Sequence, residues 1–221
     1  ASFPIVFAAS ILGRSTLRQE QNSYAGVSNK VLSKYVNRIC VSYENMERFF
    51  PKKKIQFAGN PIRKSILNFD LDIEDSKNFF NLNNENTTIL VIGGSLGAKS
   101  INESISENIS FFVENKLNLL WQTGVLYEET SKNTLTKIGL NTLNCYKFIN
   151  QMHHAYAAAD IIISRAGAIA ISELSYVGKP VILIPSPNVA ENHQMKNAQS
   201  LVNKNSALMV KDVDARLKLV E

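Results

Sequence analysis

The sequence predicts an α/β protein whose parallel sheets are covered by helices. Short apolar runs rich in β-branched residues alternate with segments of helical apolar spacing along almost all of the 221 residues. A glycine-rich turn at 93–98 follows one of these runs, as is typical of strand-to-helix corners in such sheets. Because parallel strands joined through a helix adopt one hand, we expect right-handed crossovers.

Three strands and three helices are expected in the first part of the chain. Turn residues bound them: Gly13 stops the first helix, and Gly59-Asn60-Pro61 follows the last strand, where Gly and Asn tolerate positive φ. Residues 19–22 are polar and are expected to form a loop. The expected helices are 3–12, 26–36 and 45–50, and the expected strands are 15–18, 38–43 and 55–58.

The second part predicts a doubly wound domain of six strands. The expected strands are 87–92, 117–122, 144–148, 161–164, 180–184 and 207–210, and the helices between them are 97–115, 128–138, 152–159, 169–176 and 192–202. Residues 210–221 end within this pattern, and the chain begins with Ala rather than Met. We therefore expect a piece of a longer protein.

A polar, Asn-rich stretch separates the two parts and predicts a domain boundary. The stretch runs from 70 to 86 around a weak helix, and the boundary is expected between Arg63 and about Asn86. We expect the C-terminal part of an incomplete N-terminal Rossmann-like domain at 1–63, a linker region at 64–86, and a second, truncated domain at 87–221.

Composition narrows the possible partners. The net charge is +5, from 24 basic and 19 acidic residues, which fits a phosphate-bearing substrate, an anionic membrane surface or a merely solvated surface, and is too weak for a nucleic-acid binder. Cys40 and Cys145 are expected to be buried thiols of a reducing compartment. The two neighbouring histidines, His153 and His154, have no third metal ligand nearby in the sequence, so no metal site is expected there. The aromatic and basic run 49–54 fits either a membrane contact or a buried aromatic pair beside a solvated turn.

The glycine-rich loop is a candidate phosphate site. Gly93, Gly94 and Gly97 let the backbone approach a ligand, and the helix that follows offers N–H groups and a positive dipole end to an anion such as a pyrophosphate. Ser95 adds a hydroxyl. The glycine spacing differs from the dinucleotide fingerprint, and 117–122 lacks its acidic residue. A purely structural turn is the alternative.

The stretch 160–198 suggests a site for a nucleotide that carries a sugar. Glu173 lies in the helix after Gly167, and a carboxylate accepts two hydrogen bonds from a vicinal ribose diol; an exposed helix glutamate is the alternative. The side-chain amide of Gln194 both donates and accepts, as sugar hydroxyls require.

Two polar residues of the first part follow strands. Asn22 comes after the first strand, and Arg63 comes after the 59–61 turn, from which it could reach a diphosphate across a cleft or form an ordinary linker salt bridge. Arg165 is likewise expected to neutralise phosphate or to pair with a neighbouring carboxylate.

Several motifs in register cover nearly the whole chain. They are Glu20-Gln21-Asn22-Ser23-Tyr24-Ala25-Gly26 with Asn29-Lys30, Gly59-Asn60-Pro61-Ile62-Arg63, Gly93-Gly94-Ser95-Leu96-Gly97-Ala98, Trp121-Gln122-Thr123-Gly124, Phe148-Ile149, Ser164-Arg165-Ala166-Gly167-Ala168 with Ser172-Glu173-Leu174, and His193-Gln194 with Asn197-Ala198. Their order and spacing resemble the MurG family of N-acetylglucosaminyltransferases.

The resemblance implies a GT-B architecture, with two Rossmann-like domains facing a cleft. It also implies an inverting transfer, independent of metal and cofactor, from UDP-N-acetylglucosamine to the 4-hydroxyl of the muramoyl residue of lipid I, which makes lipid II for peptidoglycan at the cytoplasmic face of the plasma membrane. The implied contacts are Glu173 with the ribose, Ile149 and Ala168, Ile169, Ala170, Ile171 and Ser172 with the uracil and its neighbours, Ser95 with the diphosphate, Gln194 with the sugar, and Asn22 and Arg63 from the first domain.

Two departures from the family pattern concern catalysis. Gln19 stands where the family commonly has His, and the family's N-terminal glycine loop with its histidine would precede Ala1, so the general base is expected upstream. A non-catalytic UDP-sugar binding fragment and a UDP-N-acetylglucosamine 2-epimerase, which would need acid and base carboxylates around the sugar, are the alternatives.

Overall fold

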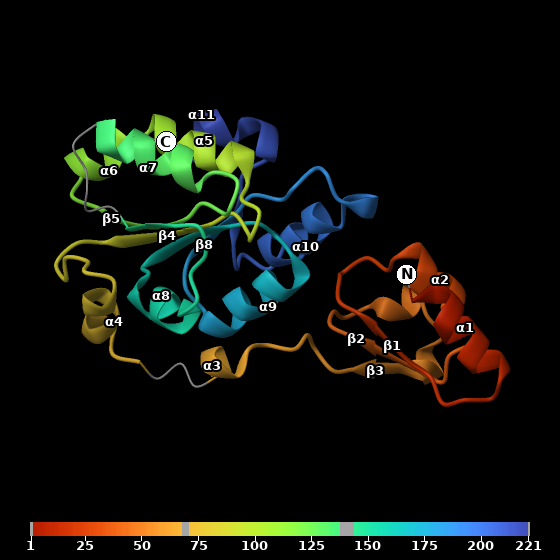
Figure 1. The fold of residues 1–221 in the computed structure, drawn as a ribbon. Coiled ribbons are helices and arrows are strands. Elements are labelled where there is room, and N and C mark those ends of the chain that lie inside the picture. The colour runs from red at the N-terminus through yellow and green to blue at the C-terminus, as the bar shows by residue number, and fades with distance from the viewer. Residues whose placement is uncertain (1, 68–70, 138–143, 221) are drawn as a thin grey trace.

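The computed structural model describes residues 2–67, 71–137 and 144–220, which fold into a smaller and a larger lobe (Figure 1). The smaller lobe contains a parallel sheet in the order β1-β2-β3. Its elements are α1 (Phe3–Ile11), β1 (Leu17–Glu20), α2 (Val27–Leu32), β2 (Arg38–Val41), the 3-10 turns Met46–Arg48 and Lys52–Lys54, and β3 (Ile55–Phe57). Leu32, Ile39, Met46 and Phe50 form its buried core.

The larger lobe has six parallel strands, as the sequence predicts. They are β4 (Thr88–Ile92), β5 (Asn118–Gln122), β6 (Asn144–Tyr146), β7 (Ile161–Ser164), β8 (Val181–Leu183) and β9 (Leu208–Met209). The spatial order is β6-β5-β4-β7-β8-β9, so the chain runs outward from β4 in one direction, returns to β7 and continues in the other. This is a doubly wound order, and its strand order reverses between β4 and β7, the kind of position at which open α/β sheets generally bind ligands.

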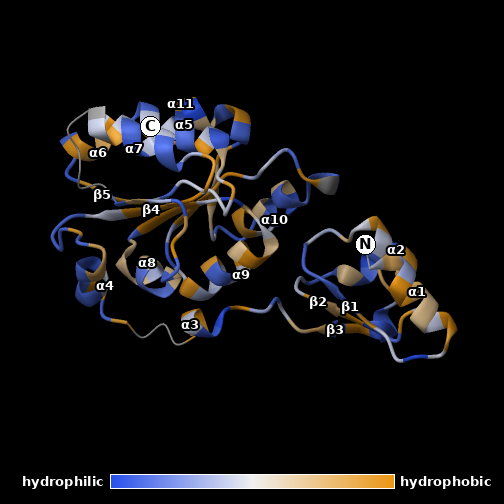
Figure 2. Ribbon diagram, in the orientation of Figure 1, coloured by the Kyte–Doolittle hydropathy of each residue, from blue (hydrophilic) through white to orange (hydrophobic). Residues whose placement is uncertain are grey.

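Helices cover both faces of this sheet (Figure 1). α5 (Lys99–Glu107), α6 (Ile109–Glu114), α7 (Glu128–Lys137) and α11 (Ala215–Lys218) lie on one face, and α4 (Ile73–Phe79), α8 (Met152–Ala158), α9 (Ala168–Val177) and α10 (His193–Val202) lie on the other. Leu90, Leu120, Ile162 and Leu183 are fully buried in the sheet. Figure 2 accordingly shows hydrophobic strands between helices that turn hydrophilic residues outward.

The segment expected to be a linker packs against the larger lobe. It contains α3 (Lys64–Leu67) and α4. Ile66, Phe80 and Leu82 are buried in the same core cluster as β4 and α8. The apolar residues of the segment thus belong to the core of the larger lobe. The placement of the domain boundary at 64–86 stays a prediction.

Several expected elements differ from the observed ones. The helix expected at 45–50 is only the 3-10 turn Met46–Arg48, and the helix expected at 26–36 ends at Leu32. β1 begins at Leu17 and includes Gln19 and Glu20, which we expected in a loop, because β1 pairs with β2 and the buried Glu20 carboxylate accepts hydrogen bonds from the N–H of Gly26 and from Asn29. The single helix expected at 97–115 is two helices. The side chain of Asn108 donates to the carbonyl of Ser104, and such side-chain bonds compete with the helical ladder.

Candidate functional site

Two glycine loops meet at the carboxyl ends of β4 and β5. Gly97 has φ +88° and Gly124 has φ +80°. A Cβ atom on Gly97 would lie 2.3 Å from the carbonyl oxygen of Thr123, and one on Gly124 would lie 2.0 Å from the Gly97 nitrogen. Both positions therefore require glycine for conformation and for space. Gly97 therefore has a structural role in the turn, and this role does not depend on whether the loop also binds a phosphate.

A buried polar network supports these loops from below. Trp121 donates its indole N–H to Asn102 Oδ1 at 3.0 Å, and Asn102 Nδ2 donates to the Thr123 carbonyl at 2.9 Å. Asn102 and Trp121 are buried. These hydrogen bonds tie α5 to β5 and to the loop that follows β5, and so stabilise the loop geometry.

A cavity of about 560 Å³ opens beside the glycine loop. Gly93, Gly97 and Gln194 line it together with the first turn of α5. The N-cap of α5, Ala98, makes no side-chain capping bond, so the N-terminal amides of this helix present their positive dipole end to the cavity. Ser95 is exposed on the same loop but does not line the cavity.

Two side chains of this cavity have fixed partners. Gln194 Oε1 accepts the backbone N–H of Ser186 at 2.9 Å, which leaves its amide nitrogen for other acceptors. Arg165 donates to the carbonyl of Ile184 and to Ser100, and it forms an ion pair with Asp212. The salt-bridge alternative for Arg165 therefore describes the observed structure.

Glu173 is held by two side chains from other elements. Arg63 Nε donates to Oε1 and Arg63 Nη2 donates to Oε2, each at 2.8 Å, and the Tyr156 hydroxyl donates to Oε2 at 3.2 Å. Only 3% of Glu173 is exposed, against 46% of the Arg63 side chain. The bonds to Glu173 raise the pKa of Arg63 further, and burial raises the pKa of Tyr156, so both remain donors. The alternative of an exposed helix glutamate is therefore wrong.

The residues expected near the uracil lie on two elements of the larger lobe. Ile149 is buried in the core, and its N–H donates to Gln122 Oε1 at 3.0 Å. Of the first turns of α9, Ile171 is buried, whereas Ala168, Ile169, Ala170 and Ser172 are half-buried. The α9 N-cap, Gly167, is extended and makes no side-chain capping bond. A hydrogen bond thus links Ile149 to β5, and its side chain belongs to the same core cluster as Ile171 of α9.

Hydrogen bonds join the two lobes. The fully buried Asn197 accepts the N–H of Ser23 at 2.9 Å and donates to Asn22 Oδ1 at 3.0 Å and to the Ala166 carbonyl at 3.4 Å. Asn60 donates to the Ser172 hydroxyl at 3.1 Å. The predicted site residue Asn22 thus lies against α10.

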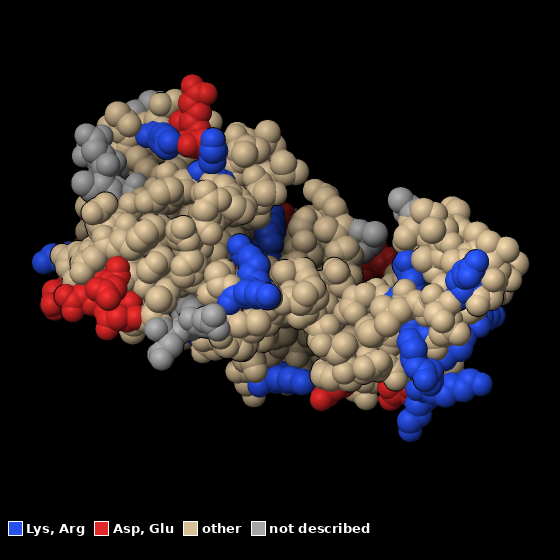
Figure 3. All heavy atoms as spheres, turned by 60° about the horizontal axis from the view of Figure 1, so that its bottom comes forward, with Lys and Arg blue, Asp and Glu red and all other residues tan. Residues whose placement is uncertain are grey.

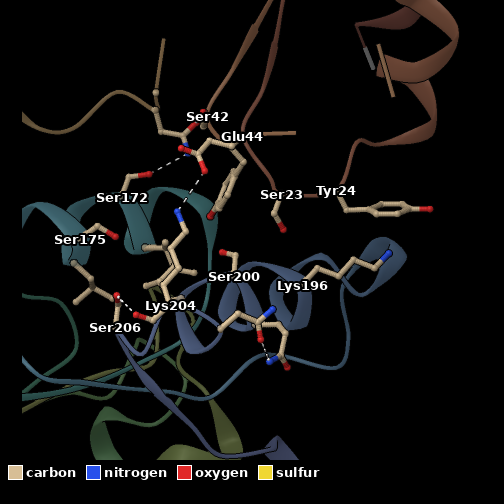
Figure 4. Close-up of a pocket in the computed structure, with 18 of the residues that line it drawn as sticks. Ser23, Tyr24, Ser42, Glu44, Ser172, Ser175, Lys196, Ser200, Lys204 and Ser206 are labelled. Atoms are coloured by element: carbon tan, nitrogen blue, oxygen red, sulfur yellow. Dashed lines mark hydrogen bonds and ion pairs between the residues drawn. The ribbon is translucent and has the colours of Figure 1, made fainter. Parts of the chain in front are cut away.

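Between the lobes runs a groove of about 1050 Å³ (Figure 4). Ser172 and Ser175 of α9 and Ser200 of α10 face Ser42 and Ser23 of the smaller lobe. Lys204 pairs with Glu44 across it at 3.6 Å, and Lys196 Nζ lies 3.1 Å from the centre of the Tyr24 ring.

Among the described residues, no three His, Cys, Asp or Glu side chains gather as metal ligands would, and no helix is both long and apolar enough to cross a membrane.

Residues 88–221 match the family model described as the glycosyltransferase family 28 C-terminal domain. The chain belongs to glycosyltransferase family 28. A relative from Cytophaga hutchinsonii, named UDP-N-acetylglucosamine--N-acetylmuramyl-(pentapeptide) pyrophosphoryl-undecaprenol N-acetylglucosamine transferase, is 52% identical over the whole chain. The chain spans 59% of that relative's length.

Solved structures agree with the predicted GT-B fold. The crystal structure of MurG from Acinetobacter baumannii superposes with a TM-score of 0.73 and 29% identity, over 96% of this chain and 57% of that one. A UDP-GlcNAc 2-epimerase from Methanocaldococcus jannaschii has a TM-score of 0.58 at 13% identity, over 99% and 65% of the two chains, which shows a shared fold alone. The family 28 chain is therefore an α/β protein of GT-B type.

In this family 28 chain, sequence reasoning missed three buried polar residues that hold the candidate site together. Tyr156, Asn102 and Asn197 are buried polar residues whose partners lie on other elements. Asn197 belongs to the motif His193-Gln194 with Asn197-Ala198, which carries part of the family resemblance. Its place in that motif was the one signal that could have identified it as a site residue. Nothing in the local sequence distinguishes Tyr156 from an ordinary core aromatic residue.

Proposed function

We propose that the chain is the donor-binding part of an enzyme that transfers N-acetylglucosamine from UDP-N-acetylglucosamine to lipid I. The observation that carries this proposal is the 52% identity, along the whole chain, with a relative that is named for this reaction. The reaction contributes lipid II to peptidoglycan and so to cell-wall growth, cell shape and division.

The donor groups have chemically suitable partners in the larger lobe. The diphosphate binds at the glycine loop, where Gly93, Gly94, Ser95 and Gly97 precede the uncapped N-terminus of α5. Gln194 lines the adjoining cavity and takes the sugar hydroxyls. The uracil binds near Ile149 and the first turns of α9, residues 168–172.

Glu173 binds the ribose hydroxyls. Because Arg63 is paired with this carboxylate, ribose binding also affects Arg63. A ribose diol and Arg63 compete for the acceptor positions of one carboxylate. Arg63 is partly exposed, so ribose binding releases its guanidinium toward the donor diphosphate. Asn22 contributes from the smaller lobe.

Charge stabilisation is the main chemical contribution of these residues. When the acceptor hydroxyl displaces UDP, negative charge gathers on the departing diphosphate. The helix amides at the glycine loop and Arg63 stabilise that charge where it forms. The general base that deprotonates the acceptor hydroxyl is not among the residues proposed here. Gln19 stands where the family commonly has His. Its side-chain amide donates to the Ser42 hydroxyl and to the Gly59 carbonyl, and so stabilises the smaller lobe.

A peripheral position at the cytoplasmic membrane face fits the smaller lobe. α1 is hydrophobic along its length, and Ile5, Ile11 and Leu12 are 66–75% exposed (Figure 2). Lys and Arg side chains also gather on this lobe, as Figure 3 shows, and the lobe carries the three lysines of the turn Lys52–Lys54. A lobe that carries both an exposed apolar helix and basic side chains suits an anionic lipid surface. The run 49–50 does not serve here, because Phe50 is buried and Phe49 packs against Tyr24.

The alternatives have less support. A 2-epimerase needs free acid and base carboxylates, but Glu103 and Asp212, which line the cavity, pair with Lys99 and Arg165. A non-catalytic UDP-sugar binding fragment differs from the proposal only in turnover.

The test is a transfer assay with UDP-[¹⁴C]N-acetylglucosamine and a lipid I analogue. The chain is assayed alone and as a chimera that carries the N-terminal segment of the Cytophaga hutchinsonii relative. We expect labelled lipid II analogue from the chimera and a markedly lower rate from its Glu173→Ala variant at subsaturating donor, because that variant binds the donor more weakly. A chimera that folds and binds UDP but does not transfer would favour the binding fragment, and release of a 2-epimer would favour the epimerase.

A further inference from the structure

Glu173 has one fixed and one exchangeable partner. Arg63 is partly exposed and lies on the segment between the two sheets, so it can leave the carboxylate without disturbing a core. Tyr156 is 2% exposed on α8 and belongs to the core cluster of the larger lobe, as do Ile171 and Leu174 of α9. The Tyr156 ring is therefore fixed relative to the helix that carries Glu173.

The hydroxyl of Tyr156 can only donate to this carboxylate. Burial and the neighbouring carboxylate raise the phenol pKa, which favours the protonated hydroxyl. A donor fixed at 3.2 Å from Oε2 limits rotation of the carboxylate about its terminal torsion. Oε1, which contacts only Arg63 among the described residues, is the oxygen left for a ligand once Arg63 withdraws.

We propose that Tyr156 is a positioning residue, whose buried hydroxyl fixes the Glu173 carboxylate in the orientation that receives ribose hydroxyls and so makes the site selective for ribonucleotides over 2′-deoxyribonucleotides. This inference rests on the proposed ribose contact of Glu173. Without the hydroxyl, Glu173 keeps its charge and its place on α9 but is held by the exchangeable Arg63 alone.

Calorimetric titration of the chain with UDP and with 2′-deoxy-UDP tests the inference. For the unmodified chain we expect UDP to bind about tenfold more tightly than 2′-deoxy-UDP, the scale of one hydrogen bond to a charged group. In Tyr156→Phe, which keeps the ring, we expect this ratio to fall to about 2, mainly through weaker UDP binding. A merely structural role would weaken both ligands equally.

Tyr146→Phe is the matched control. The Tyr146 hydroxyl donates to Asn144 at 3.0 Å, and its ring packs against the same core cluster, away from Glu173. We expect the control to keep the tenfold ratio. If Tyr156→Phe does not fold, Tyr156→Met removes the donor with a side chain that fills irregular space.

The outcomes separate the inference from the function beneath it. An unmodified chain that does not bind UDP, or that binds both ligands equally, would remove the ribose contact and this inference with it. An unmodified chain that discriminates, together with a Tyr156→Phe variant that discriminates equally well, would overturn the role of Tyr156 and leave the proposed function standing.

Discussion

Arg63 and Glu173 hold each other through two 2.8 Å hydrogen bonds, although they lie 110 positions apart in the chain. The pair ties the segment between the two sheets to the middle of α9. Sequence reasoning assigned the two residues to different parts of the same ligand, the diphosphate and the ribose. Their contact shows that both assignments concern one connected group of side chains.

Removal of Arg63 should destabilise the larger lobe. Arg63→Ala leaves the buried Glu173 with only the Tyr156 hydroxyl, and we expect a loss of about 1–2 kcal/mol in the free energy of unfolding, less than for a fully buried pair because Arg63 is partly exposed. Urea denaturation measures it. Lys204→Ala, which breaks a well-exposed pair with Glu44, is the control and should change little. Equal effects of the two variants would contradict a structural role for Arg63.

Gly97 should tolerate no side chain. Gly97→Ala combines a positive φ with a Cβ 2.3 Å from the Thr123 carbonyl, so we expect a loss of at least about 3 kcal/mol in the free energy of unfolding. Gly178 has φ +70° but open space where a Cβ would lie, and Gly178→Ala should cost only about 1 kcal/mol. Thermal and urea unfolding of the two variants measure the cost of the steric clash as the difference between their losses in the free energy of unfolding. Similar losses would contradict the tight packing of the two glycine loops.

Asn197 should control the contact between the lobes. Asn197→Ala removes three hydrogen bonds to Ser23, Asn22 and Ala166, and we expect the free energy of unfolding to fall by about 2–3 kcal/mol. Hydrogen exchange at the Ser23 amide should accelerate at least about tenfold. Asn203→Ala, at the exposed end of α10, should leave that amide unchanged. Unchanged exchange in Asn197→Ala would show that other contacts hold the lobes together.

Cys145 should react slowly with alkylating reagents. Burial raises the pKa of its thiol to about 11, so at pH 8 only about 0.1% is thiolate. The rate of iodoacetamide modification, followed by peptide mapping, should rise about tenfold per pH unit between pH 8 and 10. Glutathione is the control, and a rate at pH 8 equal to that of glutathione would contradict the raised pKa.

The strands of the larger lobe could be predicted because their composition carries the signal. β4 and β7 are runs of buried Ile, Leu and Val, and such runs seldom form anything else. β1 was misplaced by two residues because Glu20 is charged and buried at once. Its burial depends on hydrogen bonds from Gly26 and Asn29, which become visible only when the loop is folded.

The site residues stay a prediction, and the pairings among them could not be predicted. Gly97 and Gln194 line one cavity. This agrees with the expectation that residues following neighbouring parallel strands lie at the same edge of the sheet. The partners of Glu173 come from α8 and from the segment before α3, and no local pattern links these to α9. Contacts of this kind are set by how helices pack on the sheet rather than by spacing in the chain.

Titration of the chain with UDP tests donor binding most directly. We expect one UDP to bind per chain and Glu173→Ala to weaken this binding by about 1–3 kcal/mol, the cost of an unpaired polar contact. Glu191→Ala, an exposed carboxylate beside α10, is the control and should bind as the unmodified chain does. Unchanged UDP affinity in Glu173→Ala, or no binding by the unmodified folded chain, would contradict the donor site proposed for the larger lobe.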